Sequence, residues 1–223
     1  MKAMILAAGR GERMRPLTDQ VPKPLLEVGG KSLIVRLIER LAQAGVVDIV
    51  INHAHLGLRI EEALGNGSRY GVHIAYSAEG EALETAGGIA KALPLLGDAP
   101  FIAANADVYC DFDFASLLRR DLGKGLAHLV LVDNPSQHPR GDFVLDNGFV
   151  RNSGGGTLTF AGIGLYRPAL FAKIKVGTKA QSAPLLRAAA DQNLVSGEHF
   201  RGLWQDIGTP ERLAQINAQL QAA

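Results

Sequence analysis

The stretch Leu6-Ala7-Ala8-Gly9-Arg10-Gly11-Glu12-Arg13-Met14-Arg15-Pro16-Leu17 decides how this sequence is interpreted. An apolar run from Ala3 to Ala8 predicts a short buried strand, and Gly9 and Gly11 then turn the chain into a loop. Glycines let backbone N–H groups approach an anion closely, and successive N–H groups in such a turn form a phosphate-binding concavity. The stretch therefore predicts a phosphate-binding loop at the end of the first strand.

Two cationic side chains accompany this loop. Arg13 and Lys23 place positive charge beside the concavity, where a polyphosphate would lie. Pro22 and Pro24 stiffen the backbone on both sides of Lys23 and so limit where its ammonium group can point. The stretch lacks both the Gly-x-x-x-x-Gly-Lys-Ser/Thr pattern and the third glycine of a dinucleotide fingerprint. A different kind of phosphate loop is indicated.

The grouping resembles the signature of the sugar-1-phosphate nucleotidyltransferases. That signature reads roughly Leu-Ala-Ala-Gly-x-Gly-Thr-Arg-x-x-Pro-Leu-Thr, followed by Pro-Lys-Pro-Leu. Residues Leu6–Thr18 and Pro22–Leu25 match it nearly throughout, with Glu12 where threonine is usual. The resemblance implies that Arg13, Lys23 and Asp107 are catalytic. It also implies that the nucleotide is bound by Ala7, Ala8, Gly9, Gly11, Glu12, Arg13, Lys23, Thr85, Gly87 and Gly88.

Composition narrows the class of protein. A chain of 223 residues that is 47% hydrophobic can bury one substantial core. Its formal net charge is +1 without a basic block, which argues against a nucleic-acid partner. Cys110 is the only cysteine, which excludes an internal disulfide and fits a reducing cytoplasm, and no apolar run approaches the length of a membrane span. We expect a cytoplasmic monomer or small homo-oligomer.

Strand and helix patterns alternate through the first two-thirds of the chain. A helical pattern at Leu33–Ala44 separates strand patterns at Ala3–Ala8 and Val46–Asn52, which predicts a mainly parallel sheet. After Asp133 the pattern changes to turns, with a hairpin at Asn147-Gly148. We expect one Rossmann-like α/β domain over residues 1–223, with a mixed, mainly parallel sheet flanked by helices. The resemblance implies the nucleotide-diphospho-sugar transferase type, with a nucleotide-binding portion at 1–133 and a sugar-binding portion at 134–223.

Two aspartates stand at predicted strand ends. Asp107 ends the run Phe101–Asp107 and would face the same crevice as the glycine loop. A carboxylate there suits Mg²⁺, which prefers oxygen ligands, although a turn or cap aspartate is the commoner interpretation of such a position. Asp206 lies in Trp204–Leu213, where helix capping explains the residues that follow it but not the aspartate itself. The resemblance implies that Asp107 and Asp206 share one metal ion.

Two further segments carry site predictions. Glu84–Ile89 opens a predicted helix whose small residues let a flat base or a sugar approach, while Thr85 is alternatively a simple N-cap. The resemblance implies nucleotide contacts by this segment. It also implies that the sugar phosphate is bound by Asn105, Gly141 and Asn152, although a Glu-Lys pair common in the family is not evident here.

The implied reaction is attack by a sugar-1-phosphate oxygen on the α-phosphorus of a nucleoside triphosphate, with Mg²⁺ and without a general base. Within the family the chain looks closest to the bacterial branch that transfers UMP from UTP to N-acetylmuramate 1-phosphate in cell-wall recycling. Mannose-1-phosphate guanylyltransferases and glucose-1-phosphate thymidylyl- or uridylyltransferases are the alternatives. A catalytically silent nucleotide-sugar sensor is the alternative of another class. A dehydrogenase is disfavoured because Asn52-His53 stands where an acidic residue would bind ribose.

Overall fold

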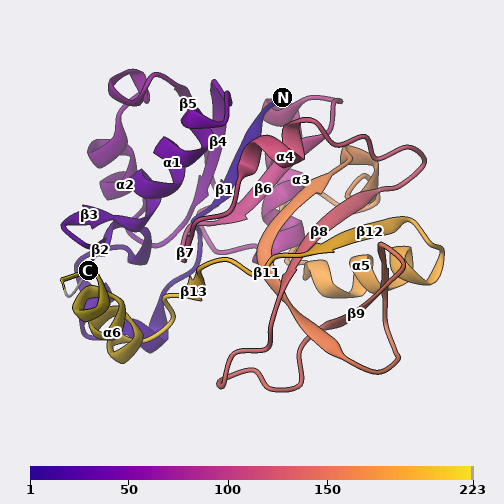
Figure 1. The fold of residues 1–223 in the computed structure, drawn as a ribbon. Helices are drawn as coiled ribbons and strands as arrows, with labels where there is room; N and C mark the ends of the chain where they lie inside the picture. Colours follow the sequence, from indigo (N-terminus) through magenta and orange to yellow (C-terminus); the bar gives the residue numbers. More distant parts are fainter. Residues whose placement is uncertain (222–223) are drawn as a thin grey trace.

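The computed structural model describes residues 1–221, in which one large sheet passes through the whole molecule (Figure 1). Its strands are β1 (Ala3–Leu6), β4 (Asp48–His53), β5 (His73–Ala78), β6 (Phe101–Asn105), β8 (Ala127–Val132), β9 (Phe143–Asp146), β10 (Phe149–Arg151), β11 (Thr157–Tyr166) and β12 (Val195–His199). They are arranged in the order β5-β4-β1-β6-β11-β8-β12-β10-β9. The helices are α1 (Leu33–Gln43), α2 (Gly57–Leu64), α3 (Glu84–Leu96), α4 (Phe114–Leu118), α5 (Ser182–Asp191) and α6 (Pro210–Gln221).

The first half of the sheet is parallel. β1 pairs in parallel with β4 on one side and with β6 on the other, and β4 pairs in parallel with β5. β11 then pairs antiparallel with both β6 and β8, so the sheet becomes mixed. Helices cover both of its faces, and the fold class expected from the sequence is confirmed. No helix within residues 1–221 has the length and apolar character needed to cross a membrane.

The alternation of side chains along each strand produces two separate cores. Ile5 and Ile51 point to the face covered by α1 and α2 and are fully buried there. Met4 and Val50, their immediate neighbours in the chain, point to the opposite face and pack against α3 and α5. Strands buried on both faces are apolar at consecutive positions rather than alternating, which explains the continuous apolar runs in the sequence.

The second half of the sheet contains the predicted hairpin. β9 and β10 pair antiparallel, and Asn147 and Gly148 connect them with φ angles of 49° and 79°. Positive φ at both central residues is the signature of a tight hairpin turn, which Asn-Gly favours. β12, in contrast, was not predicted, because Val195–His199 contains a glycine and two charged or titratable side chains in place of an alternating apolar pattern.

Two small sheets complete the fold. β7 (Val108–Cys110) pairs antiparallel with β13 (Trp204–Asp206), and β2 (Glu27–Val28) pairs with β3 (Lys31–Ser32). β7 was not predicted, since three residues are too few to show a strand period. The pairing with β13 matters because it joins the segment after β6 to a segment almost one hundred positions later in the chain.

Candidate active site

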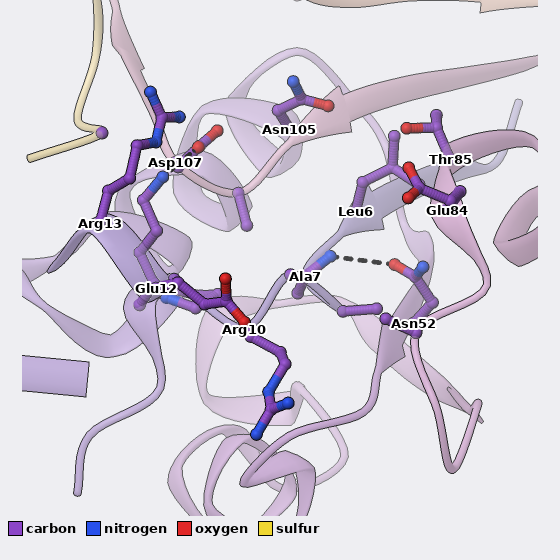
Figure 2. A pocket seen from close by; sticks show the side chains of 18 residues that line it. Leu6, Ala7, Arg10, Glu12, Arg13, Asn52, Glu84, Thr85, Asn105 and Asp107 are labelled. Atoms are coloured by element: carbon purple, nitrogen blue, oxygen red, sulfur yellow. Dashed lines mark hydrogen bonds and ion pairs between the residues drawn. The ribbon is translucent and has the colours of Figure 1, made fainter. Parts of the chain in front are cut away.

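A cavity of about 650 Å³ opens beyond the carboxyl ends of β1 and β6 (Figure 2). The glycine loop after β1, the Lys23 turn, the start of α3 and the end of β6 all contribute to its wall. The lining residues are Leu6, Ala7, Ala8, Gly9, Arg10, Gly11, Glu12, Arg13, Lys23, Pro24, Asn52, Ala82, Glu84, Thr85, Asn105, Ala106, Asp107 and Gly208. The loop and strand-end residues singled out from the sequence therefore lie around one pocket.

Gly9 and Gly11 are needed in the loop for different structural reasons. Gly11 has a φ of +67°, and a Cβ there would lie 3.0 Å from the Thr18 Cγ2 and 3.1 Å from the Lys23 Cβ. The Thr18 hydroxyl donates a hydrogen bond of 2.8 Å to the Gly11 carbonyl and closes the turn. Gly9 has no heavy atom within 4 Å of its Cβ position. Gly11 thus permits the turn, while Gly9 leaves the backbone open to a ligand.

Lys23 and Asp107 form an ion pair at one end of the pocket. The ammonium group of Lys23 contacts Oδ2 of Asp107, and the side chains are 11% and 30% exposed. Arg13 points into the pocket on the same side, as Figure 2 shows, and its guanidinium makes no ion pair within residues 1–221. This end combines two cations with one carboxylate, so it can hold phosphate groups and a metal ion together.

Strand pairing brings the second predicted metal ligand next to the first. Asp206 lies opposite Val108 in the β7–β13 pair, and the Ile207 N–H donates a hydrogen bond of 2.8 Å to the Asp107 carbonyl. The Asp206 carboxylate forms an ion pair with Arg212. Its Oδ1 also accepts a hydrogen bond of 2.8 Å from the amide of Gln137. Asp206 itself is not among the pocket-lining residues, whereas Gly208, two positions later, is.

The donor set of these two aspartates suits a magnesium ion. Both carboxylates are partly exposed, at 30% and 28%, and each is neutralised in this structure by one cation. No cluster of three or more His, Cys, Asp or Glu side chains that could hold a metal occurs within residues 1–221. Mg²⁺ commonly takes only one or two carboxylates and completes its shell with waters and substrate phosphates. Asp107 and Asp206 therefore fit the ion only in company with a bound phosphate.

A buried polar network under the pocket was missed from the sequence. Oδ1 of Asn52 accepts a hydrogen bond of 2.9 Å from the Ala7 N–H, and its amide donates to Glu79 Oε1 at 2.6 Å. Glu79 Oε2 accepts from the Leu83 N–H at 2.7 Å. Asn52 and Glu79 are only 2% and 8% exposed, so the network ties the glycine loop to the start of α3. The sequence did contain one indication of this network, because Asn52 is a polar residue near the end of a predicted strand.

The start of α3 differs from the sequence prediction. Thr85 is not an N-cap, because the helix begins one residue earlier, at Glu84, with Leu83 at the capping position. Thr85 lines the pocket, whereas Gly87 and Gly88 do not. A Cβ on Gly87 would lie 2.3 Å from the Thr178 carbonyl oxygen, and one on Gly88 would lie 2.4 Å from Glu79 Oε1. Close packing of α3 explains both glycines, and their predicted nucleotide contacts stay predictions.

The sugar-phosphate residues predicted in the second half lie outside the pocket lining. Gly141 has a φ of +58°, and a Cβ there would lie 2.5 Å from Asn134 Oδ1, so the turn itself requires a glycine. The Asn152 amide donates to the Arg187 carbonyl at 2.9 Å and to Asp191 Oδ1 at 2.7 Å. Of the three predicted sugar contacts, only Asn105 lines the pocket. The roles of Gly141 and Asn152 stay predictions.

Cys110 lies beside the site, on β7, but does not take part in it. Its side chain is buried, and desolvation raises the pKa of the thiol above its ordinary value. A nucleophilic cysteine needs a lowered thiol pKa, so the buried Cys110 is a packing residue.

Comparison with known proteins shows the family of the chain. The family model described as "Nucleotidyl transferase" matches residues 2–144. An N-acetylmuramate alpha-1-phosphate uridylyltransferase from Neisseria meningitidis is 56% identical over 228 residues, which cover 98% of this chain and 97% of the relative. A mannose-1-phosphate guanyltransferase from Gibberella zeae is 33% identical, and the match covers 95% of this chain but 62% of that relative. The chain thus spans less than two-thirds of the guanyltransferase's length.

Similarity in three dimensions extends over the whole chain. A putative glucose-1-phosphate thymidylyltransferase from Bacillus anthracis superposes with a TM-score of 0.87 at 22% identity, covering 100% of this chain and 96% of that one. At this identity the similarity shows the fold alone. The family match covers more than half of the chain and contains the glycine loop, Lys23 and Asp107. By this match and by the 56% identity to the uridylyltransferase, the chain belongs to the nucleotidyl transferase family.

Proposed function

We propose that this chain transfers UMP from UTP to N-acetylmuramate 1-phosphate, giving a nucleotide-sugar and pyrophosphate in cell-wall recycling. The observation that carries the proposal is the 56% identity to the Neisseria uridylyltransferase, which extends over 97% of that protein. The guanyltransferase relative is 33% identical and extends well beyond the match. The longer and closer match favours UTP and N-acetylmuramate 1-phosphate over GTP and mannose 1-phosphate.

The reaction joins two anions. An oxygen of the sugar phosphate forms a bond to the α-phosphorus of UTP, while the bond from that phosphorus to the pyrophosphate oxygen breaks. The attacking oxygen is already ionised at neutral pH, so no side chain has to remove a proton. The pocket is consistent with this, because the cationic side chains of Arg10, Arg13 and Lys23 are among its lining residues. The chain must position the two phosphates in line and offset their repulsion.

We assign the phosphate contacts to the residues around the ion pair. The backbone N–H groups of residues 9–13, together with the Arg13 guanidinium, hold the β- and γ-phosphates that leave as pyrophosphate. Lys23 neutralises the α-phosphate oxygens, since its ammonium group lies at the same end of the pocket as Asp107. Ligand binding exchanges the Lys23–Asp107 ion pair for contacts to phosphate.

We further propose that Asp107 and Asp206 hold Mg²⁺ in the working enzyme. The bound ion would supply charge neutralisation to oxygens of both reacting phosphates. Arg212 pairs with the Asp206 carboxylate and Gln137 donates a hydrogen bond to it, so both would orient this ligand. Residues 1–133 would bind the nucleotide and residues 134–223 the sugar, in the cytoplasm, where UTP is available.

Measurement of pyrophosphate release tests this assignment. Purified protein is given each of UTP, GTP, dTTP and ATP with each of N-acetylmuramate 1-phosphate, glucose 1-phosphate, N-acetylglucosamine 1-phosphate and mannose 1-phosphate. We expect the largest kcat/KM with UTP and N-acetylmuramate 1-phosphate, and no turnover when the magnesium is chelated. A larger kcat/KM with GTP and mannose 1-phosphate would contradict the proposal. Nucleotide binding without turnover in any combination would favour the sensor alternative.

A further inference from the structure

Glu84 has an unusual backbone conformation in the wall of the pocket. Its φ is +62°, a left-handed value that residues with a Cβ adopt only at a cost in free energy. Its side chain is exposed and makes no hydrogen bond or ion pair within residues 1–221. No residue of the described part of the chain therefore pairs with the carboxylate that this position carries. Strained residues of this kind cluster at ligand-binding sites.

Hydrogen bonds on both sides hold the strained residue in place. Just before it, the Leu83 N–H donates to the buried Glu79 at 2.7 Å, and the Leu83 carbonyl accepts from the Ala180 N–H at 3.0 Å. Just after it, the Ala86 N–H donates to the Ala180 carbonyl at 2.9 Å. The backbone around Glu84 is thus determined by its neighbours. The side chain projects into the pocket as a consequence of the fold rather than by its own preference.

Glu84 and the cations Arg13 and Lys23 lie at different ends of the pocket. Figure 2 shows its carboxylate turned toward Leu6, on the side of the pocket opposite to Arg13 and Asp107. The phosphate-binding cations lie at that other side, so a triphosphate placed against them directs its nucleoside toward Glu84. A carboxylate would repel phosphates, but it accepts hydrogen bonds from O–H and N–H groups.

We infer that Glu84 is a specificity-determining residue, whose carboxylate accepts a hydrogen bond from the nucleoside of the bound triphosphate. The inference rests on the proposed function, because it takes the pocket to bind a nucleoside triphosphate. Two groups of UTP carry the required donors: the ribose hydroxyls and the N3–H of uracil. Both present the same chemistry to a carboxylate, and substrate analogues separate them.

Kinetics of three variants test the role of the carboxylate. Glu84→Ala removes it and is expected to raise the KM for UTP about 10- to 100-fold, the value of one charge-assisted hydrogen bond. The kcat changes less than about threefold, because Glu84 lies away from the reacting phosphates. Glu84→Gln keeps an oxygen acceptor and should restore part of the affinity. Glu81→Gln is the matched control, since Glu81 is in the same segment, is highly exposed and forms an ion pair of 3.6 Å with the exposed Lys179.

Stability separates this role from a structural one. Glu84→Gly relieves the left-handed strain, so its Tm should be at least as high as that of Glu84→Ala, while its KM for UTP is raised as much. A structural role for the carboxylate predicts instead that both variants are less stable than the wild type, with the KM for UTP changed only in proportion to unfolding. The wild-type KM in Glu84→Ala would overturn the inference.

Analogues of UTP identify the donor. The wild-type protein is assayed with 2′-deoxy-UTP, 3′-deoxy-UTP and N3-methyl-UTP, and the Glu84→Ala variant is assayed with the same set. The analogue that lacks the recognised donor should lose affinity in the wild type but lose nothing further in the variant. If the losses add for all three analogues, Glu84 contacts none of these donors and the inference is wrong. Failure of the proposed function would appear separately, as absent turnover of UTP by the wild type.

Discussion

The two halves of the sheet contribute very differently to the pocket. Every lining residue except Gly208 lies in residues 6–107, around the parallel strands β1, β4 and β6. The hairpin β9–β10 and the turn before it contribute none. Parallel strands end at the same edge of a sheet, so polar residues that follow them accumulate there. Antiparallel neighbours end at opposite edges and do not concentrate their strand-end residues in one place.

Polar groups at the turn before β9 instead form hydrogen bonds with other residues of the second half. Asn134 donates to the Thr157 carbonyl at 3.0 Å, and the Asp142 carboxylate accepts from the Phe160 N–H at 2.8 Å. The amide of Gln137 donates to Asp206 and so connects the turn before β9 to the predicted metal ligand. The comparison indicates that the first half provides most of the pocket wall. The second half reaches the pocket through the loop that contains Gly208.

The largest effect should come from the ion pair at the phosphate end. Lys23→Ala removes the cation held against Asp107 and is expected to lower kcat by about 10²–10³, as for loss of one electrostatic transition-state contact. Steady-state kinetics and thermal unfolding of the same preparations check this. Lys31→Ala breaks an exposed ion pair with Glu39 and serves as the control, with unchanged kcat. If Lys23→Ala lowers Tm but leaves kcat unchanged, the Lys23–Asp107 ion pair has only a structural role. The proposed difference in catalytic contribution between the two halves would then be lost.

The next effect concerns the metal. Asp206→Asn keeps the size of the side chain but removes its charge, so we expect the affinity for Mg²⁺ in the presence of UTP to fall about tenfold or more. Isothermal titration calorimetry of wild type and variant measures it. If Asp206 serves only to pair with Arg212, the variant will lose stability and bind magnesium as the wild type does. In that event the second half would contribute nothing to the chemistry.

The sequence allowed more of the first half to be predicted than of the second. The predicted strand run Phe101–Asp107 contains β6, and the predicted loop residues Gly9 and Gly11 line the pocket. Both predictions needed only local information, because strand ends and glycine turns are visible in short stretches of sequence. Gly87 illustrates the limit. A side chain at this position would collide with the carbonyl oxygen of Thr178, about ninety positions later in the chain. No local sequence pattern reveals that contact. Asn52 and Glu79 were missed for the same reason, since their hydrogen bonds link three separate strand ends.

A smaller effect is expected at Asn152, in the second half. Asn152→Ala removes hydrogen bonds to the Arg187 carbonyl and to Asp191 and should lower stability by about 1 kcal/mol, or a Tm decrease of about 2–4 °C. The KM for the sugar phosphate stays unchanged if Asn152 acts through these bonds alone, and rises several-fold if it is also the sugar contact predicted from the sequence. Thermal unfolding and substrate titration distinguish the two outcomes. A raised KM with an unchanged Tm would establish the sugar contact and weaken the contrast between the halves.

The smallest effect is a dependence of stability on pH that leaves catalysis unchanged. A hydrogen bond from His128, at 3.2 Å, lowers the pKa of Glu198 below its ordinary value of 4.5. Because the folded-state pKa is depressed, the stabilisation is present above pH 4.5 and is lost as the pH falls through the folded pKa. Glu198→Gln should therefore be less stable than wild type at neutral pH, by less than about 1 kcal/mol, and the difference should shrink toward zero in acid. Unfolding measured between pH 3 and 7 checks this. The pH profile of kcat/KM should be the same in both proteins, because Glu198 does not line the pocket. A shifted profile in Glu198→Gln would mean that this titrating group of the second half affects catalysis.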